Sequence, residues 1–444
     1  MPRRLGYMLA FAVLTTAAQA DTVTSFQLEI GLDVVVKEDH RAPVVTQMVW
    51  YRAGAADEVA GKSGIAHFLE HLMFKGTDDV GPGELSAIVE AQGGNDNAFT
   101  TWDYTAYFQH VAADRLDLMM KLEADRMRDL RLAEADVKTE LQVILEERSQ
   151  RTDSDPGALL TEQVDAALFQ NLRYGVPIIG WRHEMETLNR DDALAWYSRY
   201  YAPNNAILVV AGDVLPDDVR KMAEAHYGPL KPTPGLMPRV RPSEPPQLSE
   251  RRLTLSDERV SQPYVSRNYL ARERNTGDQK KAAALVILAQ LLGGSGTTSV
   301  MARALQFDTQ TAVYSSAFYD GTSIDSATFG LAVVPVPGVS LQQAEDAMDG
   351  VIAKFLKDGV EPKAFARIKT QIAAADIYAR DDIGGLANKY GEALAIGLTI
   401  KDVQDWPGIL AAVTPEEVMS AAAEVFDKRS AVTGWLLKDE GVAQ

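Results

Sequence analysis

The sequence has 444 residues, six histidines, no cysteine and a formal net charge of −18. The acidic balance argues against a nucleic-acid partner, and the lack of cysteine excludes disulfides and thiolate metal sites. A metal centre in this chain would therefore have to use histidine and carboxylate side chains.

The first twenty residues have the three parts of a secretory signal peptide. Arg3 and Arg4 form a basic start, residues 5–13 are an apolar run, and Ala18-Gln19-Ala20 is a small-residue cleavage site. Removing residues 1–20 takes the formal net charge from −18 to −20. The pattern predicts export to the periplasm, and no other stretch has the length and apolar character that predict a membrane span.

The remaining chain of about 420 residues is too long for one core of ordinary size, so we expect two domains. Seven of the 20 prolines lie between Pro229 and Pro246, in a stretch that cannot form a helix or a central strand. We therefore predict a first domain over residues 21–228, a proline-rich linker over 229–250 and a second domain over 251–444.

The first half opens with two alternating segments, Phe26–Lys37 and Val44–Arg52, which predict strands. The stretch SGIAHFLEHLMFKGT, residues 63–77, follows them and has apolar residues at helical spacing. Ser63 is the expected N-cap and Gly76 the expected stop. We predict one short helix here.

Two of the six histidines and a glutamate fall in one five-residue stretch of this helix, residues 67–71. His67 and His71 are four apart, so they project from one helix face and can hold one metal ion. Glu70 lies beside them, where its carboxylate can act as general base on a water that the metal activates. The spacing is the inverted zinc motif HxxEH. The alternative is a pair of histidines that make ordinary hydrogen bonds.

A second helix is expected after Pro82-Gly83, followed by a glycine turn and a short strand that pairs with Tyr104–Val111. Two more helices are expected, over Ala113–Leu130 and Ala133–Gln150. The next strand of the first half is expected over Ala206–Val214.

The last of these helices carries three glutamates that could supply a third ligand. Glu140 and Glu147 are seven residues apart, which is two turns, so they share one helix face. Glu146 points about 100° away and is the weaker candidate. A solvated acidic face is the alternative for all three.

The segment HFLEHLMFKGT, together with ELQVILEE at Glu140–Glu147, resembles the signature of the pitrilysin and insulinase family of zinc peptidases, and more narrowly its processing-peptidase-like branch. The resemblance implies that Glu147 is the third zinc ligand, with His67 and His71. It also implies that Glu140 orients a ligating histidine, which would fix the tautomer of that histidine. The expected activity is hydrolysis of peptides by zinc-activated water, with Glu70 as general base.

The resemblance also covers the segment Asn97-Ala98-Phe99-Thr100. In the family, a similar NAFT segment is an edge strand on which the peptide substrate lies by strand addition, a mode that uses backbone groups. We therefore expect Asn97, Ala98, Phe99 and Thr100 to bind the peptide. The alternative is that Asn97 and Phe99 only complete a hairpin.

The second half reads as a divergent copy of the first. Ala284–Gly294 mirrors the metal helix, and apolar residues stand where its histidines and glutamate would fall, namely Leu285, Leu288 and Ala289. Val360–Asp381 repeats the register of Leu132–Asp153 and places Ala375 opposite Glu147. We therefore expect one zinc ion per chain.

Pattern and resemblance together predict an α+β fold of two homologous α/β-roll halves. Each half is expected to be a sheet rich in antiparallel pairs and backed by helices. Only the first half is expected to carry metal ligands.

One feature departs from the family pattern. Active members commonly carry an arginine and a tyrosine about seven residues apart in the second half, and here Gln306 and Val313 occupy those places. Arg303, Tyr314 or Tyr319 could substitute for that pair. Because some family enzymes divide the two sites between different subunits, we expect a homodimer or a heterodimer in which this chain bears the zinc. The alternatives are a catalytically inactive scaffold subunit and, less favoured, a protein for metal uptake or storage.

Overall fold

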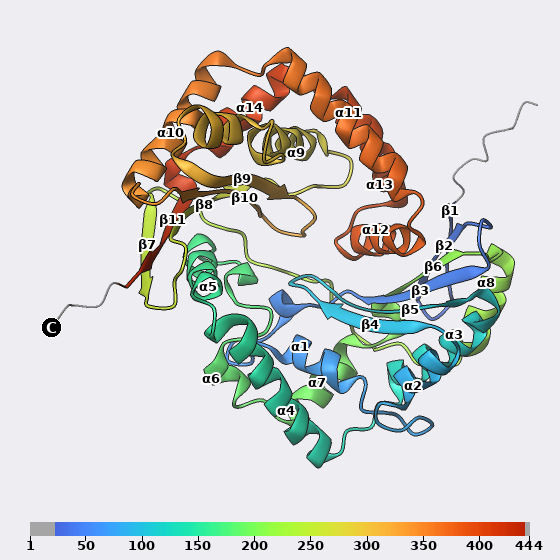
Figure 1. Cartoon of the computed structure of the whole chain (residues 1–444). Coiled ribbons are helices and arrows are strands. Elements are labelled where there is room, and N and C mark those ends of the chain that lie inside the picture. Colours follow the sequence, from blue (N-terminus) through green and yellow to red (C-terminus); the bar gives the residue numbers. More distant parts are fainter. Residues whose placement is uncertain (1–22, 440–444) are drawn as a thin grey trace, which may run out of the picture.

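The computed structural model describes residues 23–439 and contains two β-sheets with helices packed on them (Figure 1). The signal peptide predicted for residues 1–20 lies outside the described residues. The strands of the first sheet are β1 (Val23–Gln27), β2 (Asp33–Glu38), β3 (Val44–Tyr51), β4 (Asn95–Thr100), β5 (Thr105–Ala112) and β6 (Ala206–Gly212). The strands of the second sheet are β7 (Arg251–Asp257), β8 (Tyr264–Ala271), β9 (Ala312–Asp320), β10 (Ala327–Pro335) and β11 (Ala431–Lys438).

The α-helices follow the same division along the chain. Those of the first half are α1 (Ile65–Leu72), α2 (Glu84–Ala91), α3 (Leu116–Arg128), α4 (Glu134–Arg148), α5 (Pro156–Leu168), α6 (Arg182–Met185), α7 (Arg190–Tyr200) and α8 (Pro216–His226). Those of the second half are α9 (Lys280–Gly293), α10 (Leu341–Asp358), α11 (Pro362–Ala379), α12 (Ile383–Ala395), α13 (Ile400–Ala412) and α14 (Pro415–Val425). Among the described residues, no helix combines the length and the apolar character needed to cross a membrane.

The two sheets share one topology, as the internal repeat predicts. The first has the order β1-β2-β6-β3-β5-β4 and the second the order β7-β11-β8-β10-β9. In each, one parallel pair, β2 with β6 and β7 with β11, is followed by antiparallel pairs only. Strand β1 is an addition to the first sheet. The predicted α+β fold of two related halves, each rich in antiparallel pairs, is confirmed.

The prediction of one strand over Phe26–Lys37 is wrong, because the segment forms a hairpin of β1 and β2. The chain turns at Gly31, whose φ of +87° lies in the left-handed region that glycine adopts at little cost. A Cβ at this position would approach Asn204 Cβ to 2.9 Å, so the turn also needs the missing side chain. The alternating pattern continues through the turn, which is why it looks like one strand.

The helices α1, α3, α7 and α8 cover one face of the first sheet and enclose the largest buried apolar cluster of the described chain. The opposite face is covered by a helix from the other half, α12. There Ala387 and Tyr390 pack with Trp50 and Ile207, and a Cβ at Gly391 would come within 2.1 Å of the Trp50 ring. The second half therefore backs the sheet of the first.

The reverse exchange occurs at the second sheet. Helix α5, from the first half, packs against β7 and β11 (Figure 1). Its side chains Leu160 and Val164 lie in one buried cluster with Val432 and Leu436. Each half thus contributes one helix that covers the sheet of the other half.

Residues 229–250 contain no helix or strand and run between α8 and β7. Arg241 anchors this segment by ion pairs with Asp57 at 3.1 Å, with Asp103, and with Asp325 of the second half at 3.1 Å. All four side chains are largely buried. This proline-rich segment is therefore fixed to both halves at their junction.

Candidate metal centre

Helix α1 forms where the sequence predicts it, but its first turn is capped differently. The N-cap is Gly64, at a φ of +89°, and Ser63 is not a cap, because its hydroxyl accepts a hydrogen bond from the Trp181 amide at 2.9 Å. The carboxylate of Glu58 instead accepts from the amides of Gly64 and Ala66, at 3.1 and 3.0 Å. Burial raises the pKa of Glu58 to about 8.

The end of α1 also differs from the prediction. The helix stops at Leu72, and Gly76 follows it at a φ of +107°, in a close turn against the backbone of Val80. Gly76 therefore shapes the turn after the helix and does not end it.

His67 and His71 lie side by side on α1, with their ring centroids 4.7 Å apart. Helix α4 brings Glu147 up to both rings: Glu147 Oε2 lies 3.6 Å from His67 Nε2 and 3.3 Å from His71 Nε2. Ligand atoms of the three side chains lie within 4.8 Å of one another. Two imidazoles and one carboxylate with an open position are a donor set that suits catalytic zinc.

Glu140, two turns before Glu147 on α4, lies behind His71. Its Oε1 is 2.9 Å from His71 Nδ1, and its Oε2 is 2.5 Å from Lys75 Nζ. Burial opposes the charge of Glu140, but these two partners outweigh it and lower the pKa of its carboxyl. An ionised carboxylate only accepts, so Nδ1 carries the hydrogen toward Glu140 and Nε2 is the nitrogen that a metal can use.

The two histidines have different electrostatic environments. Burial and the neighbouring His71 lower the pKa of His67 to about 4, so His67 is neutral as a ligand must be. Burial also disfavours the charge on His71, but hydrogen bonds with Glu140 and Glu147 raise its pKa to about 9. Nδ1 of His67 is buried and has no hydrogen-bond partner. A metal bound at Nε2 of His71 would take the place of a proton there.

Glu70 points from α1 toward the end of strand β4. Its Oε2 accepts a hydrogen bond from the Thr100 hydroxyl at 2.5 Å. Burial raises the pKa of the Glu70 carboxyl above its ordinary value, against the opposing effect of the Thr100 hydrogen bond. A carboxylate with a raised pKa beside a metal site is suited to proton transfer.

The predicted substrate strand is β4, which lies at the edge of its sheet and pairs on one side only, with β5. Thr100, the last residue of this strand, hydrogen-bonds Glu70 beside the metal-ligand group. The Asn97 side chain accepts a hydrogen bond from the amide of Ala98 at 2.8 Å, and the Phe99 ring packs edge-on against Trp50 at 5.5 Å. The side chains of Asn97, Phe99 and Thr100 thus contact other parts of this chain. No strand of the described chain pairs with the outer backbone edge of β4.

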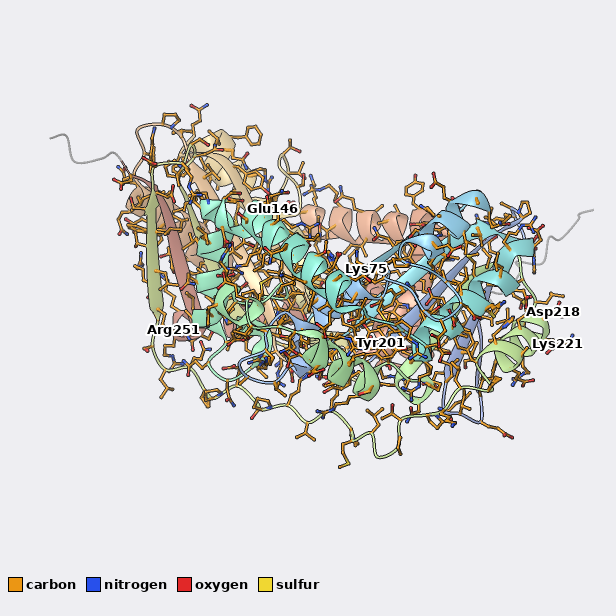
Figure 2. All side chains as sticks on the ribbon, turned by 90° about the horizontal axis from the view of Figure 1, so that it is seen from below. Lys75, Glu146, Tyr201, Asp218, Lys221 and Arg251 are labelled. Atoms are coloured by element: carbon orange, nitrogen blue, oxygen red, sulfur yellow. The ribbon has the colours of Figure 1, made fainter. Side chains whose placement is uncertain are left out.

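Two basic side chains near the cluster were not predicted. Arg151 Nη1 lies 2.6 Å from Glu147 Oε1, the oxygen that faces away from the histidines, and Lys75 pairs with Glu140. Arg151 is four residues after Glu147, so the ordinary helical spacing of charges could have suggested that pair, whereas Lys75 lies beyond the end of α1 and pairs with a residue of α4. Glu146, the weaker ligand candidate, is exposed on α4 and accepts from Gln150 (Figure 2). It takes no part in the cluster.

The described part of the second half has no equivalent site. Leu285, Leu288 and Ala289 are buried in the core on α9, and Ala375 is exposed on α11. Within residues 23–439, the group of His67, His71 and Glu147 is the only one with metal-ligand spacing.

The residues considered as replacements for the family's arginine and tyrosine have ordinary surroundings. Arg303 lies 3.9 Å from Glu361, and the Tyr319 hydroxyl donates to the carbonyl of Arg272 at 2.5 Å. Tyr314 is about half exposed. None of the contacts in the described part of the chain links these three side chains to the metal cluster.

A buried HxxEH helix with a distant glutamate, on two related α+β halves of which one has lost the ligands, defines a class of two-domain zinc metallopeptidases. The sequence matches the models described as "Insulinase (Peptidase family M16)" over residues 33–181 and "Peptidase M16 inactive domain" over residues 187–372. The chain belongs to the M16 family of peptidases and is a zinc protease.

Individual relatives agree with this assignment. A zinc protease PqqE of Helicobacter pylori is 31% identical over 379 residues, which are 82% of either chain. A probable mitochondrial-processing peptidase subunit beta of Schizosaccharomyces pombe is 30% identical over 219 residues, covering 49% of this chain and 47% of that one.

Solved structures share the fold over nearly the whole chain. A protease from Helicobacter pylori superposes with a TM-score of 0.87 at 27% identity, over 94% of this chain and 99% of the other. The periplasmic protease PqqL from Escherichia coli has a TM-score of 0.80 at 18% identity, over 94% of this chain and 48% of that one.

The contact between Glu140 and His71 leads to a first prediction. Replacing Glu140 with Ala should weaken zinc binding by about 10- to 100-fold, because His71 loses the acceptor that orients its ring. Competition with a chromophoric chelator measures the affinity. Glu146→Ala, on the same helix but exposed, is the matched control and should bind zinc like the unchanged protein. Equal affinities for all three proteins would contradict the orienting role.

Proposed function

We propose that this chain is an exported zinc metalloendopeptidase that hydrolyses peptides or unfolded polypeptides. His67, His71 and Glu147 would bind one zinc ion per chain, Glu140 would orient His71, and Glu70 would be the general base. One observation carries this proposal: the ligand atoms of two helices converge within 4.8 Å, next to the partly buried carboxylate of Glu70, which is not needed as a ligand.

The residues present fit zinc by the chemistry of their donors. Imidazole nitrogen and carboxylate oxygen are common zinc ligands, and three protein ligands leave a position for the reactants. The buried, neutral His67 and the orientation of His71 by Glu140 are the features expected of such ligands. Zinc bound here supplies a Lewis acid that polarises the scissile carbonyl and lowers the pKa of water toward about 7.

The chain's own residues would handle the proton and the substrate. Glu70 would take a proton from the attacking water and return it to the leaving amine. The peptide would lie along the outer edge of β4, over Asn97, Ala98, Phe99 and Thr100, paired through backbone hydrogen bonds. The free edge of β4 and the contact between its last residue and Glu70 support this placement.

Export to the periplasm is proposed from the signal pattern of residues 1–20. The basic start, apolar run and small-residue cleavage site are the parts that the secretion machinery reads. The structural relative from Escherichia coli is described as a periplasmic protease, which agrees with this location but shares only the fold at its level of identity.

A dimer is proposed because the second half lacks the family's arginine and tyrosine at the expected places. Gln306 donates to the Ser315 hydroxyl at 3.0 Å, and Val313 is exposed. Another member of the family would then supply the groups that hold the substrate carbonyl. A second copy carries the same Gln306 and Val313, so in a homodimer other side chains, such as Arg303, Tyr314 or Tyr319, would have to hold it.

Two variants separate the general base from the ligands. Glu70→Gln should keep bound zinc and lose activity, because the amide cannot accept the proton. His71→Ala should lose both zinc and activity. Zinc content by atomic emission and turnover of an internally quenched peptide library report the two properties. Normal turnover by Glu70→Gln would remove the general-base assignment.

The dimer proposal is tested by purifying the chain without any other family member. A heterodimer predicts slow peptide cleavage by the isolated chain and full cleavage after the partner, captured from the native periplasm, is added. A homodimer predicts a mass of two chains in light scattering together with full activity. A fully active monomer would contradict both forms of the proposal.

A further inference from the structure

The strand that is proposed to bind the peptide also contacts the proposed general base. Thr100 is the last residue of β4, and its hydroxyl lies 2.5 Å from Glu70 Oε2. The same hydroxyl is 3.4 Å from the hydroxyl of Thr105, the residue that pairs with Thr100 across the hairpin. Thr105 in turn donates to the carbonyl of Ala53 at 3.1 Å and is fully buried. Each hydroxyl has a single hydrogen, given by Thr100 to Glu70 and by Thr105 to Ala53, so it is the backbone pairing of Thr100 with Thr105 that places the Thr100 hydroxyl toward α1.

Glu70 has few other polar partners. Within residues 23–439, the Thr100 hydroxyl is the one group that hydrogen-bonds the Glu70 side chain. The other groups that act on this carboxyl, His71, Glu147 and Arg151, do so through their charges. A glutamate side chain has three rotatable bonds, so a single hydrogen bond decides where its carboxylate points.

The geometry points to Thr100 as a positioning residue for Glu70, distinct from its backbone role in binding the peptide. The hydroxyl donates to Oε2 and so orients the carboxylate, and Oε1, which accepts no hydrogen bond from residues 23–439, is the oxygen we assign to take the proton from water.

This role connects substrate binding to proton transfer. Thr100 is part of the edge strand that would pair with the peptide backbone, and its hydroxyl is the group that orients the base. One hairpin therefore places both. Small displacements of reacting groups can cost large factors in rate, so a base tied to the substrate strand keeps its geometry relative to the bound peptide. The inference rests on the proposed function, in which Glu70 is the base.

The test compares Thr100→Val, Thr100→Ser and Thr370→Val in the full chain with its bound zinc. Val keeps the β-branched shape that suits a strand but removes the hydroxyl, whereas Ser keeps the hydroxyl. Thr370 lies exposed on α11, where its hydroxyl bonds only to the carbonyl of Ala366, and its variant controls for loss of a threonine hydroxyl elsewhere.

For Thr100→Val we expect kcat to fall by about 10- to 100-fold, with KM, zinc content and melting temperature unchanged. Thr100→Ser should recover most of the rate, and Thr370→Val should behave like the unchanged protein. Adding Thr100→Val to Glu70→Gln should cause no further loss, because both changes act on the same proton transfer. Kinetics on a quenched peptide selected from the library measure all of these.

Other outcomes separate this inference from the proposed function. An inactive Glu70→Gln together with a fully active Thr100→Val would overturn the positioning role alone. A Thr100→Val that raises KM and leaves kcat unchanged would also overturn it and leave Thr100 as a substrate contact. An active Glu70→Gln would instead overturn the proposed function.

Discussion

We propose that the metal centre depends on the hydrogen bond between Glu140 of α4 and His71 of α1. Glu140 and Glu147 are two turns apart, so fixing Glu140 at His71 Nδ1 also fixes the rotation of α4 that brings Glu147 to Nε2. Lys75 completes the arrangement by pairing with the other oxygen of Glu140.

The half without metal ligands supports the site from behind the sheet. The Tyr104 hydroxyl donates to Glu392 of α12 at 2.9 Å, and Trp50, which packs against Phe99 of β4, lies beneath the same helix. Helix α12 therefore holds the face of the hairpin whose edge faces the proposed substrate path. The second half has no metal ligands in its described part, but it still has a structural role. Without its helix α12, one face of the first sheet would be uncovered.

Local pattern predicted those features that depend on local geometry. The pairing of His67 with His71, the short helix around them and the β4 hairpin follow from residue spacing, and all are present. Spacing alone placed Glu140 and Glu147 on one face, and the prediction that Glu147 is the ligand and Glu140 the orienting residue came from the family resemblance. The capping of α1 by Glu58 was not predicted, because the fold of the loop before the helix brings this carboxylate to the amides of Gly64 and Ala66. It accepts the hydrogen bonds that were expected to go to Ser63.

The contacts that sequence reasoning missed join segments distant in the chain. Nothing near Thr100 signals that its hydroxyl would meet Glu70, since the contact depends on the angle between α1 and the end of β4. The exchange of α5 and α12 between the halves is likewise a matter of packing, because their apolar faces do not specify which sheet they cover. Repeats in sequence predicted two similar halves but not this exchange.

X-ray absorption at the zinc edge of the purified protein tests the central claim most directly. The account predicts one zinc per chain, bound by two imidazole nitrogens and one carboxylate oxygen at about 2.0 to 2.2 Å. The spectrum of Glu147→Gln should lose the carboxylate contribution while both imidazoles remain. A zinc ion without two imidazole ligands, or a spectrum that Glu147→Gln leaves unchanged, would contradict the convergence of α1 and α4 on one metal ion.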